Sequence, residues 1–161
     1  MEDQPLRVLV VATDHGGCRA QMLKSWLNRF GGDRIYVEVG SIQPGKLDAF
    51  AVRAMYEIGL DISGQSPDPL FKWLDEPWDW AVLMRDPKQH RPPNLTATRR
   101  ILYREFPNPA KGEGREDVVM GYYRSVRDDI HDWARSFVEQ TIGLARKDQR
   151  SGPASGVGNQ V

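Results

Sequence analysis

The stretch LRVLVVATDHGGCRAQM, residues 6–22, decides the fold. It begins with an apolar run over residues 6–11 that contains one charged residue, Arg7. Such a run is typical of a strand buried on both faces of a parallel sheet. After Gly16 and Gly17, apolar side chains recur at helical spacing until a second glycine pair at residues 31 and 32. The stretch therefore predicts a central strand, a glycine-bearing loop and a helix.

The rest of the chain repeats this alternation. A strand is predicted over residues 35–39 and a helix over residues 47–58. Further predicted elements are a strand over residues 80–84, a short helix over residues 97–103 after a proline pair, and a long amphipathic helix from about Glu116. Alternation of this kind predicts an α/β fold with a doubly wound parallel sheet.

Composition and charge limit the possible functions. The 161 residues fit one folded domain, which we place at residues 1–148, followed by a polar, glycine-rich tail at residues 149–161 that we expect to be disordered. The 22 basic residues are matched by 22 acidic ones, so no overall field would attract nucleic acid or a membrane surface. The single cysteine allows no internal disulfide and no export signal is visible, so we expect a cytoplasmic protein.

The loop over residues 12–17 is the candidate site, because ligands of open parallel α/β sheets bind beyond the carboxyl ends of the strands. Backbone N–H groups, the positive end of the helix dipole and the guanidinium of Arg19 can converge there on a tetrahedral oxyanion. The alternative is a plain turn between strand and helix with a surface arginine. The spacing alone leaves both interpretations open.

The same loop resembles the signature of the low-molecular-weight phosphatases and thioredoxin-coupled arsenate reductases, which is an apolar strand followed by Cys, five residues, Arg and Ser. The similarity continues through GSIQPGKLDAFAVRAMYEIGLDISGQSPDPL at residues 40–70, FPNPAKGEG at residues 106–114 and YYRSVRDDIHDW at residues 122–133. It covers roughly residues 6–140. The resemblance implies a four-stranded parallel sheet flanked by helices.

Most of the residues that this family uses for chemistry are replaced here. In the family, Cys attacks the substrate, Ser steadies the thiolate, Arg clamps the oxygens and a late Asp protonates the leaving group. The nucleophile position falls on Ala12 or Thr13, a choice that the sequence leaves open although Ala12 fits better, while the Ser position is Ala20 and the acid position is Asn108. Loss of a general acid typically costs about 100- to 10,000-fold in rate, and loss of the nucleophile removes the covalent route.

Arsenate reductases of the family also use resolving cysteines in the loop after the third strand. This chain has RDPKQHRPP there, at residues 85–93, without a cysteine. The resemblance therefore implies that thiol-coupled arsenate reduction is absent unless another protein lends both thiols.

We therefore expect a non-catalytic member of the family, a pseudophosphatase that binds phosphate, arsenate or a phosphorylated protein in a regulatory or scaffolding role. We expect it to need no cofactor and no metal. The residues expected to line the oxyanion site are Thr13, Asp14, His15, Gly16, Gly17, Cys18 and Arg19.

Two alternatives stay open. One is an enzyme of altered chemistry that acts on a phosphoryl ester, using Thr13, Cys18 or an adjacent pair of Asp14 and His15 as nucleophile, base or metal ligands. The other is a protein-interaction module with an empty loop, which binds its partner through residues 85–93. Cys18 is expected to pack in the core, although a helix N-terminus beside a cation tends to lower a thiol pKa.

Three further groups of residues have simpler interpretations. The tryptophans Trp73, Trp78 and Trp80 are expected to flank the mouth of the site, with core packing for at least Trp80. We interpret His90 and His131 as surface residues. The basic residues Arg99, Arg100 and Arg104 are expected to form the solvated face of the short helix.

Overall fold

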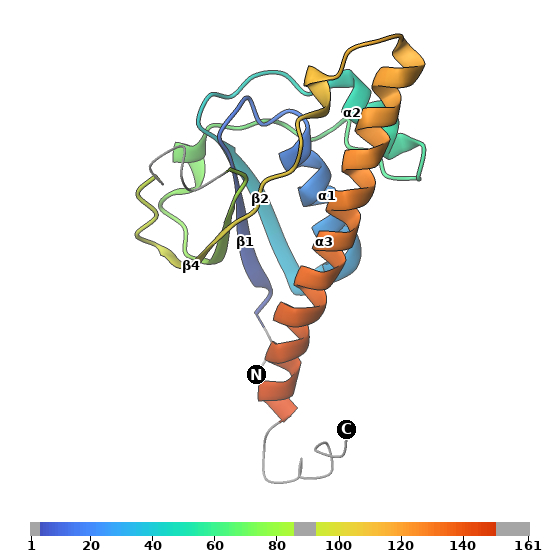
Figure 1. Cartoon of the computed structure of the whole chain (residues 1–161). Helices are drawn as coiled ribbons and strands as arrows, with labels where there is room; N and C mark the ends of the chain where they lie inside the picture. The colour runs from blue at the N-terminus through green and yellow to red at the C-terminus, as the bar shows by residue number, and fades with distance from the viewer. Residues whose placement is uncertain (1–3, 86–92, 151–161) are drawn as a thin grey trace.

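The computed structural model describes residues 4–85 and 93–150 and contains one sheet of four strands (Figure 1). The strands are β1 (Leu6–Ala12), β2 (Ile35–Ser41), β3 (Trp78–Leu83) and β4 (Thr98–Tyr103), in the order β2-β1-β3-β4. All neighbouring strands run parallel. This confirms the parallel α/β sheet and the central place of the first strand, and it brings the carboxyl ends of the strands to one edge.

The two faces of the sheet are covered differently. Side chains alternate along β1, so Val8 lies in the core on one face and Leu9 on the other. The helices that pack on the first face are α1 (Arg19–Gly31), α2 (Ala49–Tyr56) and α3 (Glu116–Arg150). The second face is covered by a smaller cluster that includes Trp78 and the short 3₁₀ helix at Leu70–Trp73.

One predicted element is wrong, because residues 98–103 form strand β4, where a short helix was predicted over residues 97–103. This segment pairs in parallel with β3. The pairing is extended by a backbone hydrogen bond from the N–H of Trp78 to the Ala97 carbonyl, at 3.0 Å. Partnership with β3 therefore decides the conformation of a segment whose own hydrophobic pattern is weak.

The three arginines of this segment consequently lie along an edge strand and just after it, not on a helix. Arg99 lies 3.9 Å from the Asp79 carboxylate. The guanidinium of Arg100 lies 5.4 Å from the centre of the Trp80 ring, and that of Arg104 lies over the Phe106 ring. Charged side chains on an edge strand also discourage pairing with another chain.

The bounds of the other elements differ from the prediction by a few residues. α2 begins after Asp48, because the Asp48 carboxylate accepts hydrogen bonds from the N–H groups of Phe50 and Ala51 and caps the helix. α3 begins at Glu116 as predicted and continues to Arg150, into the first residues of the predicted tail. The rest of the tail and His90 lie outside the described residues. No helix in the described ranges is long and apolar enough to cross a membrane.

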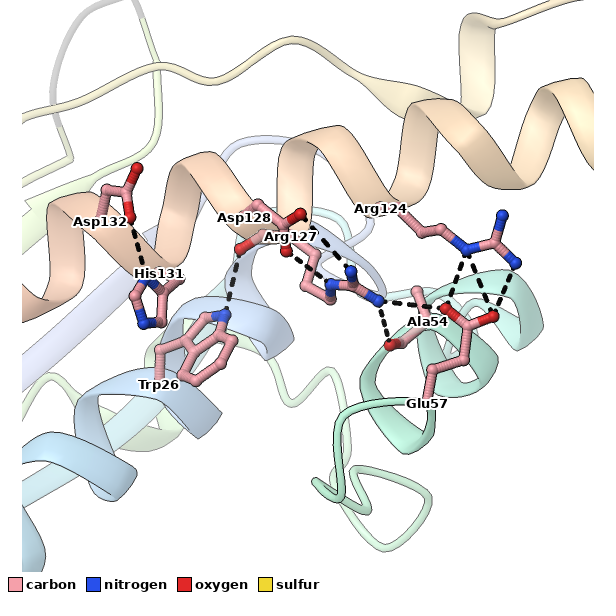
Figure 2. Close-up of polar contacts among 8 residues, drawn as sticks. All are labelled: Trp26, Ala54, Glu57, Arg124, Arg127, Asp128, His131 and Asp132. Atoms are coloured by element: carbon pink, nitrogen blue, oxygen red, sulfur yellow. Dashed lines mark hydrogen bonds and ion pairs between the residues drawn. The ribbon is translucent and has the colours of Figure 1, made fainter.

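Polar contacts fix α3 to α1 and α2 (Figure 2). Arg127 of α3 donates hydrogen bonds to the Ala54 carbonyl at 2.8 Å and to the Glu57 carboxylate at 3.1 Å. Arg124, one turn earlier, donates to both carboxylate oxygens of Glu57. On the other side, Trp26 of α1 donates from Nε1 to the Arg127 carbonyl oxygen at 3.1 Å. The backbone and side chain of one arginine thus join all three helices.

His131 is half-buried and is not the simple surface residue that the sequence indicated. Its ring centre lies 4.6 Å from that of Trp26 and 5.2 Å from that of Phe30, both on α1. Its Nδ1 lies 2.8 Å from a carboxylate oxygen of Asp132. His131 therefore belongs to the packing between α1 and α3, where Figure 2 shows it beside Trp26.

Candidate functional site

The loop between β1 and α1, residues 13–18, lies at the carboxyl edge of the sheet. β1 ends at the buried Ala12, which stands opposite Ser41 at the end of β2. α1 begins at Arg19, so the first helical residue carries the guanidinium. The loop therefore occupies the place where the sequence analysis expected an oxyanion site.

Three backbone hydrogen bonds join this β1–α1 loop to the segment of residues 42–48. They run from the N–H groups of Ile42, Gly45 and Asp48 to the carbonyl oxygens of Ala12, His15 and Gly17, at 3.0, 3.1 and 2.9 Å. In a trans peptide the C=O and the next N–H point in opposite directions. The N–H groups of Thr13, Gly16 and Cys18 therefore point away from the 42–48 segment. That of Gly16 donates to the Asp14 carboxylate, and those of Thr13 and Cys18 are oriented to serve a ligand.

Glycine is required at both central positions of the loop. Gly16 has a φ of +71°, and a Cβ there would lie 1.8 Å from the Ser41 hydroxyl oxygen. A Cβ on Gly17 would lie 2.0 Å from the Lys46 carbonyl oxygen, which is backbone and cannot move aside easily. The close approach of the two segments thus explains the glycine pair. Ser41 Oγ is buried there and lacks a hydrogen-bond partner among the described residues.

Gln21 of α1 holds the loop by a side-chain hydrogen bond. The sequence analysis did not predict this role. Its side chain is fully buried, and Nε2 donates to the Gly16 carbonyl at 2.7 Å. Its Oε1 accepts a hydrogen bond from Gln65 Nε2 at 2.9 Å. Glutamine in a helix is ordinarily exposed, so the sequence carries little signal for this role.

Arg19 and Asp14 form an ion pair across the loop. Arg19 Nη2 lies 2.8 Å from Asp14 Oδ2, and Asp14 Oδ1 accepts the Gly16 N–H at 2.9 Å. Arg19 Nη1 donates to the Phe106 carbonyl at 2.7 Å, so the segment before Asn108 reaches the site. The Arg19 side chain is 15% exposed and that of Asp14 46% exposed. The guanidinium is therefore largely buried and is held by one carbonyl and one carboxylate.

These contacts set the charge state of Asp14. Partial burial alone would raise its pKa, but the Gly16 N–H and the Arg19 guanidinium outweigh burial and hold the pKa of Asp14 below its ordinary value. Asp14 is thus ionised at neutral pH. The loop carries a fixed negative charge next to its positive one.

Cys18 is buried in the core, as expected, and its environment does not favour a thiolate. Burial, followed by the nearby Asp48 carboxylate, raises the pKa of Cys18 far above its ordinary value, and Arg19 lowers it only in part. The tendency of a helix N-terminus to lower a thiol pKa is outweighed here. Cys18 is therefore poorly suited to act as a nucleophile.

Asp48 links the loop to α3. Besides capping α2, it accepts a hydrogen bond from the Tyr123 hydroxyl at 2.6 Å, and its N–H binds the Gly17 carbonyl. Burial, and then this bond to Asp48, raise the pKa of Tyr123. The phenol therefore stays protonated and acts as a support for the loop.

The remaining predicted site residues have other partners. His15 is exposed, and its Nδ1 lies 3.0 Å from the Gln43 carbonyl oxygen, so its ring does not pair with Asp14. Asn108 uses its side-chain oxygen to accept the Ala110 N–H at 3.1 Å. Thr13 is half-buried at the start of the loop. Among the described residues, no group of three or more His, Cys, Asp or Glu side chains could hold a metal ion.

The three tryptophans do not line the mouth of the site together. Trp73 and Trp78 are buried on the second face of the sheet, where Trp73 Nε1 donates to the Val39 carbonyl and Trp78 Nε1 to the Trp73 carbonyl. Trp78 begins β3 and so lies at the opposite edge of the sheet from the loop. Trp80 packs at 5.6 Å against Phe137 of α3, which agrees with a role in packing.

The chain is similar to several arsenate reductases, although no family model matches it. It is 29% identical to the arsenate reductase of Halalkalibacterium halodurans over 133 residues, and this alignment covers 83% of this chain and 96% of that protein. It is 30% identical over 122 residues to the arsenate reductase of Bacillus licheniformis, which covers 76% of this chain and 88% of that protein.

Solved structures share the fold. An arsenate reductase in the phosphate binding state matches with a TM-score of 0.71 and 20% identity, over 84% of this chain and 98% of that one. A mutant of the YwlE arginine phosphatase with a phosphorylated active-site serine matches with a TM-score of 0.64 and 15% identity. The match covers 84% of this chain and 95% of that one. At these identities the match shows the four-stranded parallel fold.

Proposed function

Because the chain belongs to the family of the arsenate reductases and low-molecular-weight phosphatases, we propose that it binds a phosphate-like oxyanion, free or on a phosphorylated protein, at the β1–α1 loop. In this proposal the protein regulates or scaffolds and does not turn the oxyanion over through a thiol. The family resemblance supports the place of the site, and the side chains present there support the loss of turnover.

The observation that carries the proposal is the setting of Arg19. Its guanidinium stands at the N-terminus of α1 and is held by the Phe106 carbonyl and the Asp14 carboxylate. The carbonyls of this loop bind the 42–48 segment, so the N–H groups of Thr13 and Cys18 point the other way. Such a loop is suited to a tetrahedral anion. The single thiol, Cys18, is the last residue of the loop and is buried, with a raised pKa.

Calorimetric titration with inorganic phosphate and arsenate tests the binding. We expect measurable affinity in the wild type that is lost in the Arg19→Ala variant, because the guanidinium supplies the main charge of the site. A thermal melt in parallel should rise by several degrees at saturating anion in the wild type, since a ligand at about 100 times its Kd adds about 2.7 kcal/mol. Absence of binding to the wild type would overturn the proposal.

Hydrolysis of p-nitrophenyl phosphate tests the lack of turnover. We expect no hydrolysis above the rate in buffer, with or without added thiols. Hydrolysis that disappears in Arg19→Ala protein would show that the chain is an enzyme of altered chemistry. Labelling of Cys18, and Thr13→Ala and His15→Ala variants, would then locate the nucleophile or base.

The ion pair of Asp14 and Arg19 favours a second candidate, which is an interaction module with an unused loop. A guanidinium that is already paired with a carboxylate is a weaker anion receptor than a free one. In that case Arg19→Ala protein would behave like the wild type in every binding measurement. The phosphate titration therefore decides between the two candidates.

A further inference from the structure

Arg19 keeps hydrogen-bonding capacity in spite of its ion pair. A guanidinium has five N–H donors, of which one on Nη1 binds the Phe106 carbonyl and one on Nη2 binds Asp14. Among the described residues the other donors have no partner, and the side chain is partly exposed. An oxyanion can therefore bind Arg19 without displacing Asp14.

Asp14 is anchored in its position next to such a ligand. Its carboxylate is held by two donors on opposite oxygens, the Gly16 N–H at 2.9 Å and Arg19 Nη2 at 2.8 Å. The side chain is 46% exposed, so part of the carboxylate surface remains open to a ligand. An anion that reaches the guanidinium must then lie close to Asp14 as well.

A carboxylate beside a bound oxyanion selects for protonation of that oxyanion. An ionised carboxylate only accepts hydrogen bonds, so it attracts an oxygen that carries a hydrogen and repels one that does not. Hydrogen phosphate and hydrogen arsenate carry such a hydrogen at neutral pH, whereas sulfate is fully ionised. All three have similar size and tetrahedral shape, so the carboxylate distinguishes them by chemistry alone.

We propose that Asp14 is a specificity-determining residue that restricts the β1–α1 loop to oxyanions carrying a hydrogen and excludes fully ionised ones such as sulfate. The inference rests on the proposed function, since it requires that the loop binds an oxyanion through Arg19. It narrows that function to free oxyanions such as hydrogen phosphate and hydrogen arsenate, because a phosphate ester on a protein is mostly doubly ionised and carries no hydrogen at neutral pH. It also names the residue that sets this ligand class.

The test is the preference for phosphate over sulfate, measured by calorimetry at neutral pH and fixed ionic strength. In the wild type we expect phosphate to bind at least about tenfold more tightly than sulfate, because a hydrogen bond to a charged group is made with one anion and lost with the other. In the Asp14→Asn variant the amide can donate to either anion, so the preference should fall to within a few-fold. Asp129→Asn, an exposed change of equal charge on α3, should keep the wild-type preference.

The outcomes separate this inference from the proposed function. Equal binding of phosphate and sulfate to the wild type, lost in Arg19→Ala, would overturn the role of Asp14 and leave the oxyanion site standing. An Asp14→Asn variant that gains affinity for both anions by the same factor would also overturn it, because Asp14 would then only compete for Arg19. Binding of neither anion to the wild type or to Asp14→Asn protein would overturn both proposals.

Discussion

Two arginines, Arg127 on α3 and Arg19 at the start of α1, show how one side chain can serve structure or a site. The side chains of Arg127 and Arg19 are 10% and 15% exposed. The Arg127 guanidinium contacts the Ala54 carbonyl, the Glu57 carboxylate and the Asp128 carboxylate (Figure 2). Arg19 is held by one carbonyl and one half-exposed carboxylate. Each nitrogen of the Arg127 guanidinium donates to a protein acceptor, whereas Arg19 keeps N–H donors without a partner among the described residues.

This difference in hydrogen-bond partners predicts different effects of the two arginines on stability and on ligand binding. A buried charge whose partners are all protein groups can be removed only at the expense of leaving those partners unpaired. An arginine whose carboxylate partner is half-exposed costs the fold less when it is removed, because water can solvate that carboxylate. The comparison thus predicts that Arg127 carries stability and Arg19 carries ligand binding.

The largest effect is expected for Arg127→Ala. This variant leaves the Ala54 carbonyl without its donor and removes one of two cations from Glu57, so we expect a loss of about 2–4 kcal/mol in the free energy of unfolding. Denaturant unfolding measures it. Arg124→Ala is the matched control, because Arg124 binds the same carboxylate but is 45% exposed, and it should cost about 1 kcal/mol or less. Equal losses in the two variants would remove the distinction between buried and exposed arginines.

A second large effect is expected for Gly17→Ala, which changes the packing of the loop and leaves its charges in place. The added Cβ would meet the Lys46 carbonyl, so the loop and the 42–48 segment must separate, at a cost of about 1–3 kcal/mol. Phosphate binding should be lost with it, because the loop N–H groups are displaced. Gly64→Ala is the control, since a Cβ there meets nothing within 4 Å. Full phosphate affinity in Gly17→Ala protein would show that the loop geometry is not needed for binding.

Three of the four strands and the place of the loop could be predicted from the sequence, whereas strand β4 and the contacts of the site could not. The apolar run at residues 6–11 has one reasonable conformation, a buried strand, and the structure confirms it as the centre of the sheet. The segment at residues 97–103 lacks such a run, and its residues 98–103 form a strand by pairing with β3. Pairing with a distant strand leaves no signal in a local pattern. The pair of Asp14 and Arg19 depends on how a six-residue loop folds back on itself, so spacing alone could not decide whether Arg19 was paired.

A pH titration of stability tests the ion pairs that α3 makes with Glu57. The Arg124 guanidinium, with Arg127 beside it, lowers the pKa of Glu57 from about 4.5 to about 2. A depressed pKa stabilises the folded state above the ordinary pKa, and this contribution is lost as pH falls from about 4.5 toward 2. We therefore expect the stability difference between wild type and Glu57→Gln protein to be constant near neutral pH and to shrink across that interval. A difference that persists unchanged at pH 2 would contradict the assignment.

The smallest effect on stability is expected for the residue with the largest effect on binding. Arg19→Ala removes one ion pair with a half-exposed carboxylate and one hydrogen bond to the Phe106 carbonyl, so it should cost about 1 kcal/mol. Arg53→Ala, which breaks the exposed pair with Glu116, is the reference for the loss of stability on removing a surface arginine. An Arg19→Ala loss as large as that of Arg127→Ala would mean that the guanidinium is needed to hold the loop together. Loss of phosphate binding in that variant would then reflect a disordered loop, and only Asp14→Asn protein, which keeps Arg19, would still report on the site.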